Sequence, residues 1–158
     1  MSERMYTVTF DGVTVTNAGG DTDLMELDAA AEKPITVCAW TISVSSETGD
    51  AAEEMIRYKW IRGHTTSANG TSATPRPCNL TDAAAGFTAE YNGTTIGSAG
   101  TAVDLYAGAF NVRSGEIIML PEAMRFTTSA AALLHCRMMS TLADDATVSM
   151  TVWVSEAG

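Results

Sequence analysis

Four side chains of this sequence could bind a soft metal ion, namely His64, Cys78, His135 and Cys136. Structural zinc sites need about four nitrogen or sulfur ligands in a tetrahedral arrangement. The spacing is poor, because adjacent residues of a strand, such as His135 and Cys136, point to opposite faces. We therefore interpret the four as a loop histidine and buried cysteines, and we expect neither a metal nor a cofactor.

The acidic run DTDLMELD, residues 21–28, raises calcium as a possible ligand. An EF-hand loop would need an oxygen ligand where Met25 stands and a glycine where Glu26 stands, so the pattern fails at two positions. We expect these residues instead to form a solvated strand edge, whose charges discourage pairing with other chains.

Catalytic motifs are missing from the sequence. It contains no nucleophile elbow, no phosphate-binding glycine loop and no HExxH pair, and neither of its two histidines has a convincing acid-base partner. We expect the protein not to be an enzyme.

The sequence has an odd number of cysteines, and none of them has CxxC spacing: Cys38, Cys78 and Cys136. A disulfide framework is therefore not expected. No signal-peptide pattern opens the chain, and no run approaches the roughly 20 apolar residues of a membrane span. Together these features predict reduced thiols and a protein made in a cytoplasm.

Length and charge limit the number of domains and the kinds of partner that can be expected. The chain has 158 residues, which predicts a single domain over 1–158 with a sizeable core. Its 19 acidic and 9 basic residues give a net charge of -10. Nucleic acid and anionic membranes are bound through clustered Lys and Arg, so neither is an expected partner.

Period-two alternation dominates the chain and predicts antiparallel strands. In 146–156, ATVSMTVWVSE, the alternate residues from Ala146 to Val154 form one apolar face. In 5–16, MYTVTFDGVTVT, the apolar phase changes across Asp11 and Gly12, which predicts a bulge or tight turn there.

Further strands are expected at 23–28, 35–45, 55–62, 87–91, 102–112, 117–120, 124–128 and 131–140. Many short strands with glycine turns favour an all-β antiparallel sandwich, jelly-roll-like in its winding. Helix remains an alternative in two places: 50–53 has capping-box spacing, and 129–143 is rich in helix-forming residues. Alternation of apolar and polar residues favours strand in both regions.

A long loop is expected at about 63–86, where most residues are small and polar and two are prolines. Loops of this length are usually functional or disordered. Residues 63–80 lack a large apolar anchor up to Leu80, so we predict that contact with a neighbouring subunit or another partner surface orders them. The candidate contact residues are Arg57, Lys59, Arg62, His64, Pro75, Arg76 and Pro77. The alternative for the basic residues is an exposed sheet face that balances nearby acids.

Several segments carry a resemblance to a known family. They are MYTVTF, DLMELDAAAEKPI, IRYKWIRGHTTSANGTSATPRP, AGAFNV, LPEAMRF and VSMTVWVSE. In this order, and over nearly the whole chain, they resemble the landmarks of capsid decoration, or cement, proteins of tailed bacteriophages.

The resemblance implies a β-sandwich that binds the outer surface of a phage head and stabilises it, made in the host cytoplasm. Its partners would be the major capsid protein and further copies of itself. A homotrimer is also the expected way to cover surplus aromatic residues. Two alternatives remain open: a carbohydrate-binding, lectin-like module of a phage fibre, which could use Tyr91, Tyr106 and Trp153, or a tail or collar adaptor.

Overall fold

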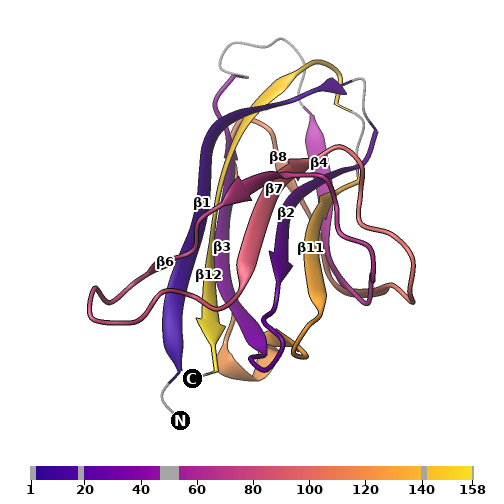
Figure 1. The fold of residues 1–158 in the computed structure, drawn as a ribbon. Helices are drawn as coiled ribbons and strands as arrows, with labels where there is room; N and C mark the ends of the chain where they lie inside the picture. Colours follow the sequence, from indigo (N-terminus) through magenta and orange to yellow (C-terminus); the bar gives the residue numbers. More distant parts are fainter. Residues whose placement is uncertain (1–2, 18–19, 47–53, 140–141, 158) are drawn as a thin grey trace.

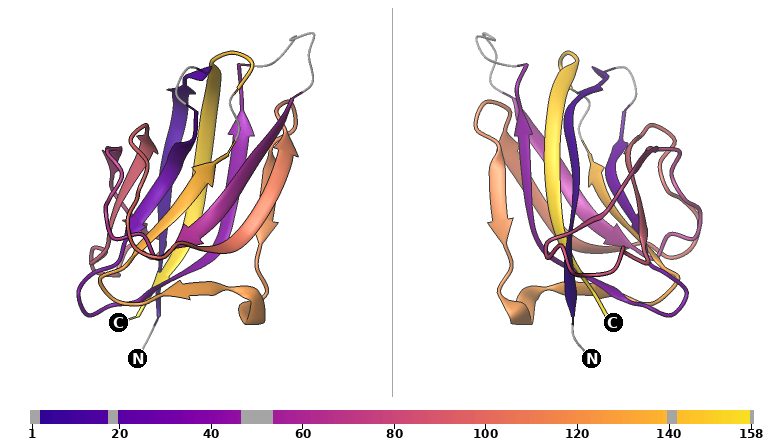
Figure 2. Two further views of the ribbon diagram at one scale, coloured as in Figure 1. Left: turned by 90° about the vertical axis from the view of Figure 1, so that its right-hand side faces the viewer. Right: turned by 60° about the vertical axis from the view of Figure 1, so that its left-hand side comes forward.

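Two antiparallel sheets packed face to face make up the protein (Figures 1 and 2). The computed structural model describes residues 3–17, 20–46, 54–139 and 142–157. Sheet A contains β1 (Arg4–Val15), β3 (Ile35–Val44), β6 (Arg76–Pro77), β9 (Glu116–Met119), β10 (Phe126–Thr128) and β12 (Ala146–Glu156). Sheet B contains β2 (Thr22–Asp28), β4 (Met55–Arg62), β5 (Thr71–Ala73), β7 (Thr88–Gly93), β8 (Val103–Asn111) and β11 (Leu133–Met138).

The chain winds between the two sheets. The order in sheet A is β10-β3-β12-β1-β6, with β9 also pairing β3, and the order in sheet B is β5-β7-β2-β11-β4-β8. Strands β1 to β4 alternate between the sheets, and β11 and β12 do the same, which is the winding of a jelly roll. The expected all-β, jelly-roll-like sandwich is therefore confirmed.

Alternation along each strand creates the core between the sheets. In β12, Val148, Met150, Val152 and Val154 are buried, whereas the residues between them up to Trp153 are half-buried. Trp40 from sheet A and Trp60 from sheet B meet inside, with ring centroids 5.6 Å apart. The period-two pattern thus fixes which side chains face the opposite sheet.

The predicted irregularity in the first strand is confirmed. The pairing of β1 with β12 shifts register between Phe10 and Val13. Gly12 has a φ of +63° there, a conformation that favours glycine. The bulge keeps both Phe10 and Val15 in the core on either side of the shift.

The possible helix at 129–143 is a strand over Leu133–Met138. It pairs β2 on one side and β4 on the other, so tertiary pairing overrides the helix propensity of its residues. The expected strand at 124–128 begins only at Phe126, after a 3₁₀ helix, η2 (Glu122–Met124). Residues 50–53 lie outside the described part of the chain.

The expected long loop at 63–86 contains two short strands. β5 pairs with β7, and β6 pairs with β1 at Tyr6 and Thr7. Before β5 in the sequence, Thr66 forms a β-bridge with Ser98. The prediction that neighbouring molecules order residues 63–80 is therefore wrong, because backbone hydrogen bonds fix this segment on its own domain.

Candidate functional site

The outward side of sheet A is unusual for so acidic a protein. Cross-strand partners share a face, so Thr9 and Thr151, or Thr7 and Trp153, point outward together. We define the uncharged face by ten outward side chains, all exposed or half-buried: Met5, Thr7, Thr9, Ala39, Thr41, Ile117, Met119, Ser149, Thr151 and Trp153. None of these ten side chains carries a charge.

Charged residues border the uncharged face without entering it. Asp11 stands at one end, where its carboxylate accepts a hydrogen bond of 2.6 Å from Ser149 Oγ. Arg76 lies opposite Thr7 on β6, at one edge of the sheet. Arg125 lies beyond the other edge, between β9 and β10.

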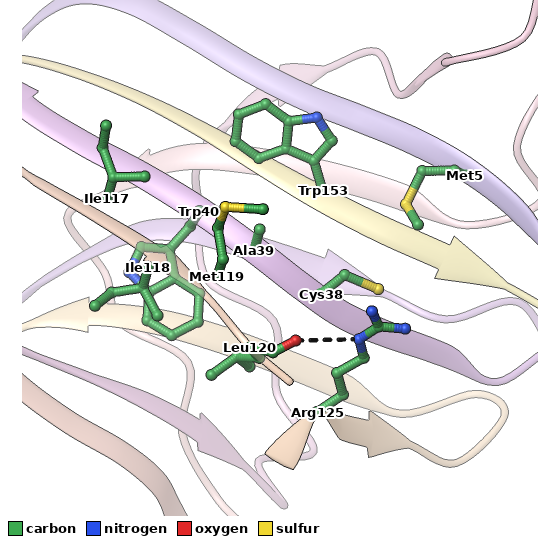
Figure 3. Close-up of a pocket in the computed structure, with 10 residues that line it drawn as sticks. All are labelled: Met5, Cys38, Ala39, Trp40, Ile117, Ile118, Met119, Leu120, Arg125 and Trp153. Atoms are coloured by element: carbon green, nitrogen blue, oxygen red, sulfur yellow. Dashed lines mark hydrogen bonds between the residues drawn. The ribbon is translucent and has the colours of Figure 1, made fainter. Parts of the chain in front are cut away.

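An apolar groove crosses the uncharged face near β9 (Figure 3). Ala39 is the pairing partner of Trp153 on one side and of Met119 on the other, so a small residue lies between two large ones. This row of side chains produces the groove, of about 320 Å³. Its lining consists of Met5, Cys38, Ala39, Trp40, Ile117, Ile118, Met119, Leu120, Arg125 and Trp153.

The wall of the groove formed by β9 is strongly exposed. Ile117 and Met119 are 73% and 80% exposed. Arg125 closes one end, where its Nε donates to the carbonyl oxygen of Leu120 at 3.3 Å (Figure 3). Contiguous exposed apolar side chains of this kind mark interaction surfaces.

Buried hydrogen bonds hold β9 in place. Trp40 Nε1 donates to the Tyr58 hydroxyl at 2.9 Å, and that hydroxyl donates to Glu116 Oε2 at 2.6 Å. Burial and the neighbouring Glu116 carboxylate raise the pKa of Tyr58, so the phenol stays a neutral donor. The short strand that carries the exposed residues is thereby tied to β4 in sheet B.

A second polar cluster lies on the outward side of sheet B, covered by residues 63–70 and 94–101. Arg137 donates to Asp23 through Nε at 2.6 Å and Nη2 at 3.1 Å, and also to the Gly97 carbonyl at 2.7 Å. Glu26 accepts from Ser67 Oγ at 2.5 Å and from the Ala68 N–H at 2.7 Å. The cluster fastens the two covering segments to the sheet.

His135 lies at the centre of this cluster and is fully buried. Its Nδ1 is 3.3 Å from both Asp23 Oδ2 and Glu26 Oε2, but neither contact has good hydrogen-bond geometry, and no described residue forms a hydrogen bond with Nε2. The His64 ring meets it edge to face at 5.2 Å. Within the described residues, no group of three or more His, Cys, Asp or Glu is arranged to hold a metal ion.

This cluster corrects the expectation for the acidic run. Asp23 and Glu26 are buried, and β2 is an interior strand between β7 and β11, so the run is not a solvated edge. The carboxylates tolerate burial because Arg137 and backbone N–H groups compensate them. Asp23 and Glu26 hold the two covering segments in place through Gly97, Ser67 and Ala68.

The cysteines are free thiols, as expected for the three of them. Cys38 and Cys136 are buried in strands, and burial raises the pKa of the Cys136 thiol, which keeps it protonated. Cys78 is exposed, which corrects the interpretation of all the cysteines as buried. It follows β6 directly, on a surface segment with little apolar cover.

The seven predicted contact residues fall into two groups. Lys59 on β4 forms an ion pair of 2.6 Å with Asp104, and the Arg62 and His64 side chains contact backbone carbonyls of Thr127 and Ala99. Arg57, also on β4, reaches the Met139 carbonyl at 3.4 Å. Pro75, Arg76 and Pro77 lie at the β6 edge of sheet A instead. The structure does not bring the seven together.

Sequence reasoning missed the groove, although one signal was available. Residues 117–120, IIML, are apolar at every position, so this edge strand has an apolar outer face as well as an apolar inner one. The aromatic residues suggested for sugar binding are dispersed over β7 (Tyr91), β8 (Tyr106) and β12 (Trp153). Comparison with protein-family models, curated proteins and solved structures finds no match for this chain.

Proposed function

We propose that this chain is a non-enzymatic structural protein of a phage virion, resembling a cement protein, and that it attaches to the head surface through the uncharged face. The observation that carries the proposal is the uncharged face itself. Ten neighbouring outward side chains of sheet A bear no charge in a protein with a net charge of -10. Depletion of charge at the centre of a patch is characteristic of protein interfaces.

The rigidity of the platform also supports this proposal. The uncharged face lies on paired strands, not on loops, and Thr9 and Thr151 hydrogen-bond across it at 3.0 Å. A preorganised surface loses little conformational entropy when it docks. A protein that reinforces a preformed shell would benefit from such a platform.

The lectin alternative has weaker support. A sugar site usually needs an aromatic platform beside convergent polar groups. Tyr106 packs against Trp40 inside the sandwich, and Tyr91 stacks on Phe10. Only Trp153 of the three lies on the uncharged face, so they do not form one platform.

The test is co-sedimentation of the purified protein with phage heads assembled without it. We expect saturable binding of the natural chain and strong loss of binding for Thr151→Glu, because a carboxylate would then be desolvated at the centre of the interface. The matched control is Thr94→Glu, at an exposed position after β7. It should bind like the natural chain.

Two outcomes would overturn the proposal. One is an absence of binding by the natural chain to heads. The other is equal binding by the Thr151→Glu variant once circular dichroism shows that it is folded. Selective binding to a glycan array without binding to heads would favour the lectin alternative.

A further inference from the structure

One large apolar side chain is exposed outside the lining of the groove. Leu80 is 96% exposed, the highest value among the exposed large hydrophobic residues of the described chain. It lies in the segment that leaves β6 and projects beyond that edge of sheet A (Figure 1). A single exposed leucine is ordinary, but its setting here is specific.

The turn that carries Leu80 is rigid. Asn79 Oδ1 accepts from the Thr81 N–H at 3.1 Å and from Thr81 Oγ1 at 2.9 Å, and the Asp82 N–H donates to the Asn79 carbonyl at 3.0 Å. Before the turn, the Cys78 N–H donates to the Met5 carbonyl at 2.8 Å. The side chain of Leu80 is thus presented to solvent by a preorganised Asx turn.

The segment is also anchored after the turn. The Tyr6 hydroxyl donates to the Ala83 carbonyl at 3.1 Å. The N–H groups of Gly86 and Phe87 donate to the buried Glu156 carboxylate at 2.9 and 3.1 Å. Because both ends are fixed on the domain, little entropy is lost when Leu80 enters a pocket.

Charges beside the turn and beside the groove are complementary. Asp82, two residues after Leu80, forms no ion pair among the described residues, and neither does Arg125 at the end of the groove. A leucine flanked by a carboxylate matches an apolar groove that ends in a guanidinium. The Leu80 turn of one copy is therefore complementary to the groove of another copy, in apolar character and in charge.

The two surfaces are different parts of the same sheet. The turn follows β6, the last strand of sheet A on one side, whereas the groove extends from Met5 of β1 over β12 and β3 to β9 at the other edge. We propose that the Leu80 turn of one copy docks in the β9 groove of a second copy, with Asp82 pairing with Arg125. Such a contact joins different surfaces of the two molecules, so it repeats and gives a closed ring if the rotation allows.

This inference deepens the proposed function, because it uses part of the uncharged face for self-assembly and leaves the threonine rows of β1 and β12 for the head. The expected homotrimer would be one closed ring of this kind. The proposal does not depend on the head, so it can be tested on the isolated protein.

The experiment is sedimentation velocity over a micromolar concentration series. The natural chain should self-associate, whereas Leu80→Asp and Met119→Glu should each weaken association by about ten- to a hundredfold, the effect expected when burial of one large apolar side chain is lost. Both positions are exposed, so both variants should fold. The control is Val103→Asp, at an exposed apolar position on β8, which should associate like the natural chain.

Mixing the two variants gives the sharpest result. Leu80→Asp keeps an intact groove and Met119→Glu keeps an intact turn, so an equimolar mixture should form a one-to-one dimer that grows no further. A mixture that stays monomeric, a natural chain that stays monomeric, or a Leu80→Asp variant that associates normally would each overturn the inference.

A charge exchange provides a second route. Asp82→Arg and Arg125→Asp should each weaken association, and the double variant should recover part of it. Failure here is distinguishable from failure of the proposed function: the natural chain can bind heads as a monomer, or self-associate without binding heads. In the first case only this inference fails, and in the second only the proposed function does.

Discussion

Asp23 shows how a single buried carboxylate organises its surroundings. Burial alone would raise its pKa, but contacts with His135, Arg137 and the Gly97 N–H outweigh burial and hold the pKa below the ordinary value of 3.8. Gly97 packs so closely on the cluster that a Cβ there would lie 2.3 Å from His135 Cε1. Only a glycine fits between the loop backbone and the buried ring.

The lowered pKa of Asp23 has a defined effect on stability. A carboxyl group with a lower pKa in the folded state stabilises that state above its unfolded pKa, and this contribution is lost as pH falls through the folded pKa. Stability should therefore decrease as pH falls below about 3.8. Asp23→Asn should lose about 3–5 kcal/mol at neutral pH, because Arg137 is left buried without its counter-charge.

Urea unfolding at neutral pH and at acid pH measures both effects. Between neutral and acid pH, the free energy of unfolding of Asp23→Asn should fall by less than that of the natural chain. The control is Asp104→Asn at the exposed ion pair with Lys59, which should cost at most about 1 kcal/mol. Equal costs for the two variants would contradict the role assigned to Asp23.

Sequence alone could predict only part of this residue-scale arrangement. The alternation in β11 correctly separates Cys136 in the core from His135 and Arg137 on the other side. The burial of Asp23 could not be predicted, because its partner Arg137 is 114 positions away and meets it only through the pairing of β2 with β11. A local acidic pattern indicates exposure unless such a distant cation compensates it.

At the scale of elements, residues 63–86 form part of the domain's structure. β5 extends sheet B, and the preceding segment satisfies the buried Glu26 carboxylate through Ser67 and Ala68. The composition of this region predicted a loop because short backbone-paired strands need no apolar side chains. Backbone hydrogen bonds to β7 and β1 order this region instead. Strands of two or three residues are too short to show a periodic pattern in the sequence.

Deleting residues 66–73 tests this role. The deletion removes β5, the two donors to Glu26 and part of the cover of the polar cluster, so we expect a cost of a few kcal/mol and a fall of roughly 5–15 °C in the melting temperature. Ser67→Ala removes one of these hydrogen bonds and should cost about 1 kcal/mol. An unchanged melting temperature after the deletion would contradict the structural role assigned to this segment.

Long strands were predictable for a different reason. In β12 the apolar residues alternate over the whole span Ala146–Glu156, and both neighbours, β1 and β3, pair with it continuously apart from local shifts. β9 has only the span Glu116–Met119, and its outer face is apolar. Its membership of a sheet could be predicted, but the groove could not, because the groove depends on Ala39 lying between Trp153 and Met119.

At the scale of the whole molecule, the net charge of -10 and the uncharged face act in opposite directions on association. Copies of an acidic protein repel one another at long range, whereas the face brings no charge of its own into contact. The Debye length falls from about 30 Å at 0.01 M salt to about 3 Å at 1 M salt. Added salt therefore removes the repulsion much more effectively than it weakens apolar contact.

This balance predicts that self-association tightens with salt. One Asp82–Arg125 pair at an interface rim contributes at most about 1 kcal/mol, and screening it loses less than is gained by screening the general repulsion. Sedimentation of the natural chain at low and high sodium chloride measures the change. The Arg125→Asp variant, which has greater negative charge, should show a still steeper gain. Association that weakens steadily with salt would mean that ion pairs hold the interface, in which case the apolar groove is not its main source of affinity.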